Sequence, residues 1–307
     1  MINLKKICRE AFEADWREYV SLIERSIELI ESERAGKENL AIEGKLAHVA
    51  SDGRIVIVSD LHGDLKSFLQ ILKTSRFVEN VQKTNEMMIL LGDYGDRGSF
   101  SPEVYYILLK LKEALPLNIL LMRGNHEGPD DLLAHPHDLP QNFKAKFDNE
   151  GLEVYSRIRD LFPELYNIVI LNDLYVLIHG GVPSQACRID DLKYAHVKHP
   201  KEQHLEEMLW SDPGEGITGI HSSPRGAGRI FGADVTERFL DMIGVRFMIR
   251  GHEPSPGGFK TNHNGRILTL FSRKGPPYSN SSGAYLHLAP SVKPRNMHEL
   301  LAHVRQF

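Results

Sequence analysis

The chain has 307 residues, of which 41% are hydrophobic and 25% are charged, and its formal net charge at pH 7 is −4. This composition is typical of a soluble globular protein with a substantial core, and the lack of a strongly basic block argues against a protein that binds the nucleic-acid backbone. No apolar run approaches the ~18 residues of a membrane span, and we recognise no signal peptide. The two cysteines, Cys8 and Cys187, form no CxxC pattern. We therefore expect a cytoplasmic protein.

The first patterned segment is an amphipathic stretch over residues 4–32. Its apolar residues recur mostly three and four positions apart, which predicts a helix or a helix pair that ends near Gly36. We interpret residues 1–36 as an N-terminal helical extension that packs against the core. Docking of a partner protein on this extension is the alternative interpretation.

Residues 46–288 are expected to form the core of a single domain that spans residues 1–307. In its first half, apolar and β-branched runs alternate with helical patterns, which predicts strand–helix–strand crossovers and a parallel sheet buried on both faces. Pro102 fits the first turn of one of these helices, with Ser101 as its cap. The expected strands are 55–58, 87–91 and 118–122, and the expected helices are 65–74 and 101–115.

The second half is less regular. The polar, proline-containing segment 128–142 predicts a long loop. Asn172-Asp173 between two apolar runs is a hairpin signal, and the last two strands are expected to be antiparallel. The remaining expected elements are helices at 152–161 and 232–243, hairpin strands at 168–171 and 175–178, strands at 245–249, 267–271 and 284–288, and a short helix in the tail 293–307.

Short polar strings follow several of the predicted strands and carry side chains of the kinds that bind divalent metals. Asp60 and His62, two positions apart, suit two ligands of one metal, and the carboxylate of Asp93 has two oxygens that can bridge two cations. Each residue alone would be an ordinary loop residue, but together they predict one metal site at one edge of a sheet. The six candidate ligands are Asp60, His62, Asp93, Asn125, His179 and His252.

The number of candidate ligands indicates two metal ions. Six N and O ligands with one bridging carboxylate leave room for water on each metal. Two metals ~3.5–4 Å apart lower the pKa of a shared water and clamp the attacking and leaving oxygens of an in-line displacement. Because no thiolate is among the ligands, we expect manganese, with iron or zinc as alternatives, rather than a structural zinc site.

Four further residues would have no task in a purely structural metal site. Arg97 and Arg225 can each place a guanidinium fork on phosphoryl oxygens, although Arg225 could also be a surface arginine in a glycine-rich loop. His126 leaves the same turn as Asn125 and is placed to protonate a leaving alkoxide, with Asp96 as its orienting partner. A histidine that only supports a neighbouring ligand is the alternative for His126.

The motifs resemble a known family. The patterns GDxHG, GDxVDRG, GNHE, HGG and RGH, in this order, are those of the phosphoprotein phosphatases, metal-dependent Ser/Thr phosphatases, and the chain is similar to a compact prokaryotic-like member over residues 46–288. The resemblance implies an α/β protein with the calcineurin-like metallophosphoesterase fold, a central β-sandwich of mixed sheets flanked by α-helices. It also implies that Asp93 bridges two metals, with Asp60 and His62 on the first. The implied ligands of the second are Asn125, His179 and His252.

The resemblance further implies direct attack of a dimetal-bound hydroxide on phosphoserine and phosphothreonine, with phosphoproteins as the expected partners. In this scheme Arg97, Asn125 and Arg225 bind phosphate, and His126, paired with Asp96, is the general acid. The chain departs from the family where glycine stands at position 95 instead of valine and in the segment before Tyr278, a candidate for the family's tyrosine. Segment 128–142 also differs, so we do not expect the grooves for regulatory subunits.

Two other functions compete with this one. The same metal centre could cleave a dinucleoside polyphosphate or another small phosphoester, because fold and metals do not determine the substrate. The chain could also be a non-catalytic metal-binding scaffold. The Asp96–His126 pair and Arg225 favour the protein phosphatase, and the filled ligand positions argue against the scaffold.

Histidines outside the motifs need no function. Those in polar segments are interpreted as surface residues: His135, His137, His196, His199 and His204. His221 stays open because it lies near Arg225, and Cys187 is interpreted as a packing residue rather than a ligand.

Overall fold

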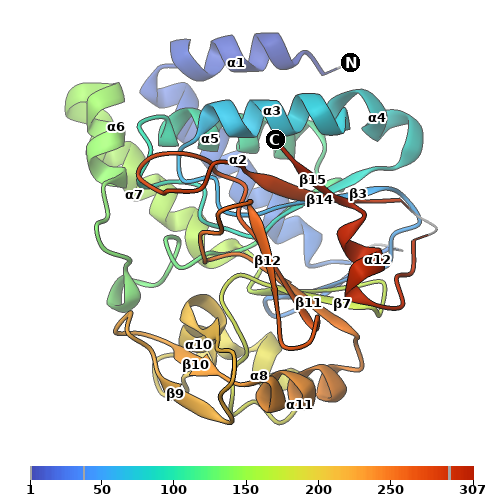
Figure 1. Ribbon diagram of the computed structural model, residues 1–307. Helices are drawn as coiled ribbons and strands as arrows, with labels where there is room; N and C mark the ends of the chain where they lie inside the picture. The colour runs from blue at the N-terminus through green and yellow to red at the C-terminus, as the bar shows by residue number, and fades with distance from the viewer. Residues whose placement is uncertain (1, 37–38, 290–291) are drawn as a thin grey trace.

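The computed structural model describes residues 2–36, 39–289 and 292–307. Their strands fall in three sheets, and side chains of the two larger sheets share one hydrophobic core (Figure 1). Over the described residues, the largest sheet has seven strands in the order β1-β2-β6-β7-β11-β13-β12. These strands are β1 (Leu40–Glu43), β2 (Leu46–Val49), β6 (Ile168–Leu171), β7 (Tyr175–Ile178), β11 (Phe247–Arg250), β12 (Phe259–Asn262) and β13 (Ile267–Leu270).

The second sheet has five strands within the described ranges, in the order β15-β14-β3-β4-β5. Strands β3, β4 and β5 run parallel, as expected, and β14 lies antiparallel to β3. The members are β3 (Ile55–Val58), β4 (Met87–Leu90), β5 (Ile119–Leu121), β14 (Ala284–Leu288) and β15 (Val304–Gln306). A small third sheet contains β8 (Asp212–Pro213), β9 (Ile220–Ser222) and β10 (Arg229–Phe231).

Helices cover the outer faces of this sandwich (Figure 1). Those of the N-terminal half lie on the side of the five-stranded sheet, and α8, α10 and α11 lie on the side of the seven-stranded sheet. None of the described helices is long and apolar enough to cross a membrane. The helices are α1 (Leu4–Glu13), α2 (Trp16–Glu33), α3 (Leu65–Ser75), α4 (Phe77–Thr84), α5 (Ser101–Ala114), α6 (Leu139–Phe147), α7 (Gly151–Leu161), α8 (Ile189–Lys193), α9 (Ala195–Lys198), α10 (His204–Trp210), α11 (Ala233–Ile243) and α12 (Met297–Leu301), with 3-10 turns η1 (Asp130–Leu132), η2 (Asp148–Glu150) and η3 (Phe162–Glu164).

The central strands are buried on both faces. In β6, Val169 and Leu171 belong to the core between the two sheets, whereas Ile168 and Ile170 pack with the helices on the outer face. Successive side chains of a strand point to opposite faces, so a strand covered on both sides must be apolar throughout. This explains why such strands are continuous apolar runs, whose carboxyl ends are the first positions open to polar residues.

The N-terminal helices are part of the main core. In α2, Tyr19 is fully buried, and its hydroxyl donates a hydrogen bond to the carbonyl oxygen of Pro102 at 2.7 Å. At the end of α2, the carboxylate of Glu33 accepts a hydrogen bond from the hydroxyl of Tyr166 at 2.9 Å and pairs with the ammonium of Lys112, which is buried. The apolar face of the amphipathic stretch therefore packs on α5 and α7.

Several expectations for the second half are wrong. The segment 128–142 is not one long loop, since it contains η1 and the start of α6, with Pro140 in the first turn of that helix, where a proline is favourable. Strand β13 is not simply antiparallel, because it pairs in parallel with β11 and antiparallel with β12. The short helix expected in the tail is confirmed as α12, but the tail also forms β15, which extends the five-stranded sheet. Strands β1, β2 and β12 and the small sheet were not predicted.

Candidate metal centre and active site

The six candidate ligands meet at one end of the sandwich. Asp60 and His62 follow β3, Asp93 follows β4, Asn125 follows β5, and the two later histidines follow β7 and β11. The carboxyl ends of parallel strands lie at the same edge of a sheet, so the topology brings these positions together. All six side chains are at most 6% exposed: Asp60, His62, Asp93, Asn125, His179 and His252.

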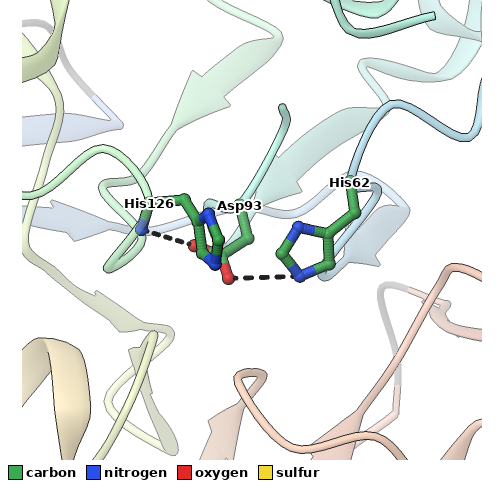
Figure 2. Close-up of side chains that lie close together, drawn as sticks. All are labelled: His62, Asp93 and His126. Atoms are coloured by element: carbon green, nitrogen blue, oxygen red, sulfur yellow. Dashed lines mark hydrogen bonds and ion pairs between the residues drawn. The ribbon is translucent and has the colours of Figure 1, made fainter. Parts of the chain in front are cut away.

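Asp93 lies between His62 and His126 (Figure 2). One of its carboxylate oxygens is 3.5 Å from Nε2 of His62, and the other is 3.4 Å from Nε2 of His179. The backbone N–H of His126 donates a hydrogen bond to this second oxygen at 3.0 Å. Asp93 has a φ of 56°, in the left-handed region that non-glycine residues seldom adopt. The structure therefore gives each oxygen of this carboxylate a different set of neighbours.

The donor atoms of this cluster suit cations. The side-chain amide of Asn125 lies 2.9 Å from Nε2 of His179 and 3.0 Å from Nδ1 of His252, and either orientation of the amide faces these same atoms. Nε2 of His252 is buried without a hydrogen-bond partner among the described residues. Buried lone pairs directed at one another are unfavourable unless protons or metal ions lie between them. The residues present thus fit a pair of divalent metal ions, with Asp93 common to both.

Hydrogen bonds direct the imidazole rings. Nδ1 of His62 lies 3.0 Å from the carbonyl oxygen of Gly95, and Nδ1 of His179 lies 2.9 Å from that of Leu91. A ring that donates its Nδ1–H to a carbonyl presents the lone pair of Nε2, as a metal ligand requires. Burial lowers the pKa of His62 to about 3, which keeps this ring neutral.

The carboxylates of the cluster respond differently to burial. Desolvation raises the pKa of Asp60. Desolvation acts on Asp93 in the same direction, but the nearby His179 and His126 outweigh it and hold the pKa of Asp93 well below its usual range. Burial also opposes the charged form of His179, yet the carboxylate of Asp93 raises the pKa of that ring to about 9, so a metal ion at Nε2 would have to displace a proton. The centre therefore keeps Asp93 ionised and acceptor-only.

His126 and Asp96 form the expected pair. Nδ1 of His126 lies 2.6 Å from Oδ2 of Asp96, whose other oxygen accepts the backbone N–H of Leu139 at 2.7 Å. Burial lowers the pKa of His126, but Asp93 and Asp96 outweigh burial and raise it above its ordinary value. Burial raises the pKa of Asp96, but its hydrogen bonds to His126 and His137 outweigh this and lower it. The pair therefore favours a protonated His126.

The two candidate arginines line the same cleft as several of the candidate metal ligands. The cleft has a volume of about 720 Å³, and its walls include Asp93, Asn125 and His126. Arg97 is held by its backbone N–H to Asp138 at 3.0 Å and by its guanidinium to the carbonyl oxygen of His135 at 2.9 Å. Two positive guanidinium groups over buried ligands make this cleft suitable for an anion.

Arg225 is oriented by a residue that the sequence did not indicate. Its Nε donates a hydrogen bond to Oδ2 of Asp212 at 2.6 Å, and the other oxygen of Asp212 accepts from the buried Arg250 at 2.9 Å. The Arg225 side chain remains 33% exposed in the cleft wall. Asp212 lies in the two-residue strand β8, which is too short for periodicity to indicate Asp212 as a partner of Arg225.

Glu127 is a second residue that the sequence analysis missed. It is fully buried, and its two oxygens accept the backbone N–H groups of Asp93 (2.7 Å), Tyr94 (3.0 Å) and Gly124 (3.1 Å) and the hydroxyl of Tyr105 (2.8 Å). One carboxylate thus joins the loop after β4 to the loop after β5. Its place as the last residue of the GNHE motif was the available signal.

Tyr278 lies in the cleft wall. Its ring stacks on that of His62 with centroids 5.5 Å apart, and burial raises its pKa. The guanidinium of Arg273 lies 5.6 Å from the Tyr278 ring. The altered segment before Tyr278 therefore still delivers an aromatic hydroxyl-bearing side chain to the site.

The interpretation of the other histidines as surface residues is partly wrong. His135 is exposed, but His204 is buried and His199 has a side chain only 9% exposed. Most notably, Nδ1 of His137 lies 2.8 Å from Oδ2 of Asp96, and its Nε2 lies 2.7 Å from the hydroxyl of Tyr155. Asp96 therefore serves two histidines rather than one.

Comparison with known proteins places this geometry in a family. The model of the calcineurin-like phosphoesterases matches residues 53–256. A protein phosphatase 2A catalytic subunit of Dictyostelium discoideum is 31% identical, and the match covers 80% of this chain and 76% of that protein. The chain belongs to the calcineurin-like phosphoesterases, in the phosphoprotein phosphatase family.

Other members of the family are longer. A probable serine/threonine-protein phosphatase of Encephalitozoon cuniculi is 35% identical over 88% of this chain but only 56% of its own length. Serine/threonine-protein phosphatase T of Aspergillus oryzae is 30% identical over 85% of this chain and 54% of its own length. The chain thus spans little more than half of these two relatives.

The fold expected from the resemblance is confirmed by a solved structure. A Saccharomyces cerevisiae protein serine/threonine phosphatase, described as similar to human phosphatase PP5, superposes with a TM-score of 0.78. The match covers 100% of this chain and 95% of that one, at 23% identity. This calcineurin-like phosphoesterase therefore has the sandwich architecture of that enzyme.

Proposed function

We propose that the chain is a dimetal phosphatase that hydrolyses phosphoserine and phosphothreonine esters in proteins. The main support is the position of Asp93, whose two oxygens face separate groups of ligand-type atoms beside the Asp96–His126 pair. The relatives from Encephalitozoon and Aspergillus are named serine/threonine-protein phosphatases and that from Dictyostelium a protein phosphatase, which supports protein substrates. The cleft over this centre is open to a side chain that projects from another protein.

Two divalent metal ions are part of this proposal, and manganese is favoured, with iron or zinc as alternatives. Asp60, His62 and Asp93 would hold one ion, and Asp93 would also contribute to the second. The remaining ligands of the second ion would be Asn125, His179 and His252. When bound, the ions supply Lewis-acid charge near the phosphoryl group and make a water more acidic.

Side chains that line the cleft bind the phosphoryl group in this proposal. Arg97 and Arg225 place positive charge at two sides of the cleft, where it stabilises negative charge that spreads over the phosphoryl oxygens in the transition state. Asp212 accepts a hydrogen bond from Nε of Arg225, which restricts the orientation of this guanidinium. The amide of Asn125 is the third proposed phosphate contact.

His126 is the proposed general acid. Its Nδ1 is engaged by Asp96, so its Nε2 is the atom that can carry a proton to the departing serine or threonine oxygen. The carboxylate of Asp96 stabilises the charged ring before transfer, and the raised pKa of His126 keeps the proton available near neutral pH.

Defined phosphopeptides provide the test. The protein is treated with a chelator and then titrated with Mn²⁺, and its release of phosphate from phosphoserine and phosphothreonine peptides is compared with its hydrolysis of diadenosine tetraphosphate. We expect turnover of the peptides that depends on the metal and is abolished in Asp93→Asn. A preference for diadenosine tetraphosphate would instead support the small-phosphoester alternative, and no turnover of either would support the scaffold.

The acid role has a separate readout. His126→Gln should reduce kcat on phosphoserine peptides by roughly 10²–10⁴-fold, the usual contribution of a positioned acid, and should reduce it much less on p-nitrophenyl phosphate. The nitrophenolate is a good leaving group and needs little protonation. Equal losses on both substrates would show that His126 supports the site in another way.

We also propose that the described residues act as one catalytic unit in the cytoplasm. The N-terminal helices contribute to the same core as the site-bearing sheets, which supports a single domain over residues 1–307 with a core at 46–288. Both cysteines, Cys8 and Cys187, are free thiols, which supports a reducing compartment. Limited proteolysis that released residues 1–36 from an intact, active core would contradict the single unit.

A further inference from the structure

A second groove adjoins the catalytic cleft. It has a volume of about 630 Å³ and lies between the beginning of α3, the loop after β4 and the segment after β13, with Phe12 of α1 at its outer end. In Figure 1, α1 and α3 both lie on the side of the five-stranded sheet. Arg97 lines both the groove and the cleft, so the two hollows meet at a residue proposed to bind phosphate.

The groove offers apolar surface to solvent. Phe12 is 54% exposed and Phe100 is 47% exposed, although their rings contact each other edge to face with centroids 6.1 Å apart. Leu69 of α3 lines the same groove. Large aromatic side chains that gather on a surface while half exposed are typical of places that receive an apolar group from a partner.

The groove is also positively charged, in a chain whose net charge is −4. Lys66 is exposed, Lys274 is half-buried, and both line the groove together with Arg273. The one carboxylate among the groove-lining residues, Asp64, is engaged at the start of α3, where it accepts the backbone N–H of Ser67 at 3.0 Å. The cationic side chains outnumber this carboxylate, so the net charge of the groove lining is positive.

Arg273 adds a buried donor to this surface. It is only 6% exposed, and its guanidinium donates to the carbonyl oxygens of His62 and Pro276. Its Nε has no hydrogen-bond partner among the described residues. A buried N–H without a partner is unfavourable. Arg273 also links the groove to the site, because His62 is one of the candidate ligands.

We propose that this groove binds the segment of the phosphoprotein that flanks the phosphorylated residue, and that it selects segments that carry acidic and apolar residues together. The inference rests on the proposed function and specifies its substrates. Lys66 and Lys274 pair with the acidic residues, and Phe12, Leu69 and Phe100 contact the apolar residue. An extended peptide advances about 3.3–3.6 Å per residue, so a few residues on one side of the phosphate reach from the Arg97 junction along the groove.

The test compares substrates with and without a flanking segment. Phosphothreonine peptides with Asp and Leu flanks are compared with peptides whose flanks are Lys and Ser, and p-nitrophenyl phosphate serves as the substrate that cannot reach the groove. For the wild-type chain we expect kcat/KM to be about tenfold higher for the acidic–apolar peptide, mainly through a lower KM. Two exposed charge pairs and one apolar contact account for a factor of this size.

The variant Lys66→Glu/Lys274→Glu should remove this preference, and Phe100→Ser should reduce it. Both should leave hydrolysis of p-nitrophenyl phosphate within about twofold of wild type. Lys73→Glu is the matched control, since it reverses an exposed lysine on the same helix α3 that does not line the groove. Equal melting temperatures would exclude a folding defect.

Four outcomes overturn the inference. A wild-type chain without flank preference, or a double variant that keeps the preference, would show that the groove does not bind the substrate. A Lys73→Glu variant as impaired as the double variant would show only a long-range charge effect. A chain that hydrolyses p-nitrophenyl phosphate but no phosphopeptide would overturn the proposed function as well, and is thereby distinguishable from a failure of the groove alone.

Discussion

Glu127→Gln tests whether one buried carboxylate holds the two ligand-bearing loops together. Oε2 of Glu127 accepts the backbone N–H groups of Asp93 and Gly124, and Oε1 accepts the backbone N–H of Tyr94 and the hydroxyl of Tyr105. Glutamine keeps one acceptor oxygen and puts an NH₂ in place of the other. The orientation of the glutamine amide with the lower free energy places this NH₂ near Tyr105, whose hydroxyl can rotate to accept a hydrogen bond. Only the backbone N–H of Tyr94 then lacks a partner.

The expected cost follows from these four contacts. One buried donor without a partner costs about 1–3 kcal/mol, and each remaining bond loses about 1 kcal/mol when the acceptor is no longer charged. Burial raises the pKa of Glu127, which means that the charged carboxylate is itself costly to bury, and the neutral amide recovers part of the loss. We therefore expect the free energy of unfolding to fall by about 2–4 kcal/mol.

Denaturant unfolding measures this change. Glu153→Gln, at an exposed position in the first turn of α7, makes the same chemical substitution and should cost less than about 0.5 kcal/mol. Because the clamp positions Asp93, Mn²⁺ should also bind roughly 10–100-fold more weakly to the Glu127 variant. A Glu127→Gln protein as stable as the Glu153→Gln control would refute the clamp, since the four hydrogen bonds would then contribute nothing.

Three other substitutions test separate parts of the molecule. Glu33→Ala removes the carboxylate that faces the buried Lys112, so denaturant unfolding should show a loss of about 3–5 kcal/mol, and a loss below about 1 kcal/mol would contradict a stabilising role for the end of α2. Burial lowers the pKa of His196 to about 4, so stability is lost as pH falls from about 6.5 to 4 while only the unfolded chain takes up a proton. In His196→Gln this loss should be smaller when melting is followed at pH 7 and pH 5, and an unchanged pH dependence would rule out the assignment. His137→Phe deletes one of the two imidazoles on Asp96, so turnover of phosphoserine peptides should fall by more than that of p-nitrophenyl phosphate, whereas equal effects would indicate a purely structural His137.

The positions of the metal-ligand candidates were predictable because topology turns sequence order into proximity. Asp60, Asp93 and Asn125 each follow an apolar run, and the ends of parallel strands share one edge. Contacts between a side chain and backbone N–H groups are harder to predict from the sequence, because every residue except proline carries a backbone N–H group. Glu127 belongs to the GNHE motif, but the motif does not indicate the three backbone N–H groups that its carboxylate accepts. Asp212 meets Arg225 through a strand of two residues, too short for periodicity.

Helix α6 was missed for a different reason. The segment before it contains several prolines, which predict a break in regular structure, and Pro140 lies in the first turn, where a proline interrupts nothing. The same residue type therefore marks either a loop or the start of a helix, and only the packing of the following residues decides between them. Phe143 and Phe147, which are buried against Tyr19 of α2, provide that packing.

The site also explains why the two large sheets must keep one relative position. Asp60 after β3, in the five-stranded sheet, accepts the backbone N–H of His252, which follows β11 in the seven-stranded sheet, at 3.1 Å. The carbonyl oxygen of Leu91 after β4 lies 2.9 Å from Nδ1 of His179 after β7. These two contacts cross between the sheets at the residues that surround Asp93. A shift of one sheet against the other would break both contacts and separate the two groups of candidate ligands, so the core between the sheets determines the geometry of the proposed metal centre.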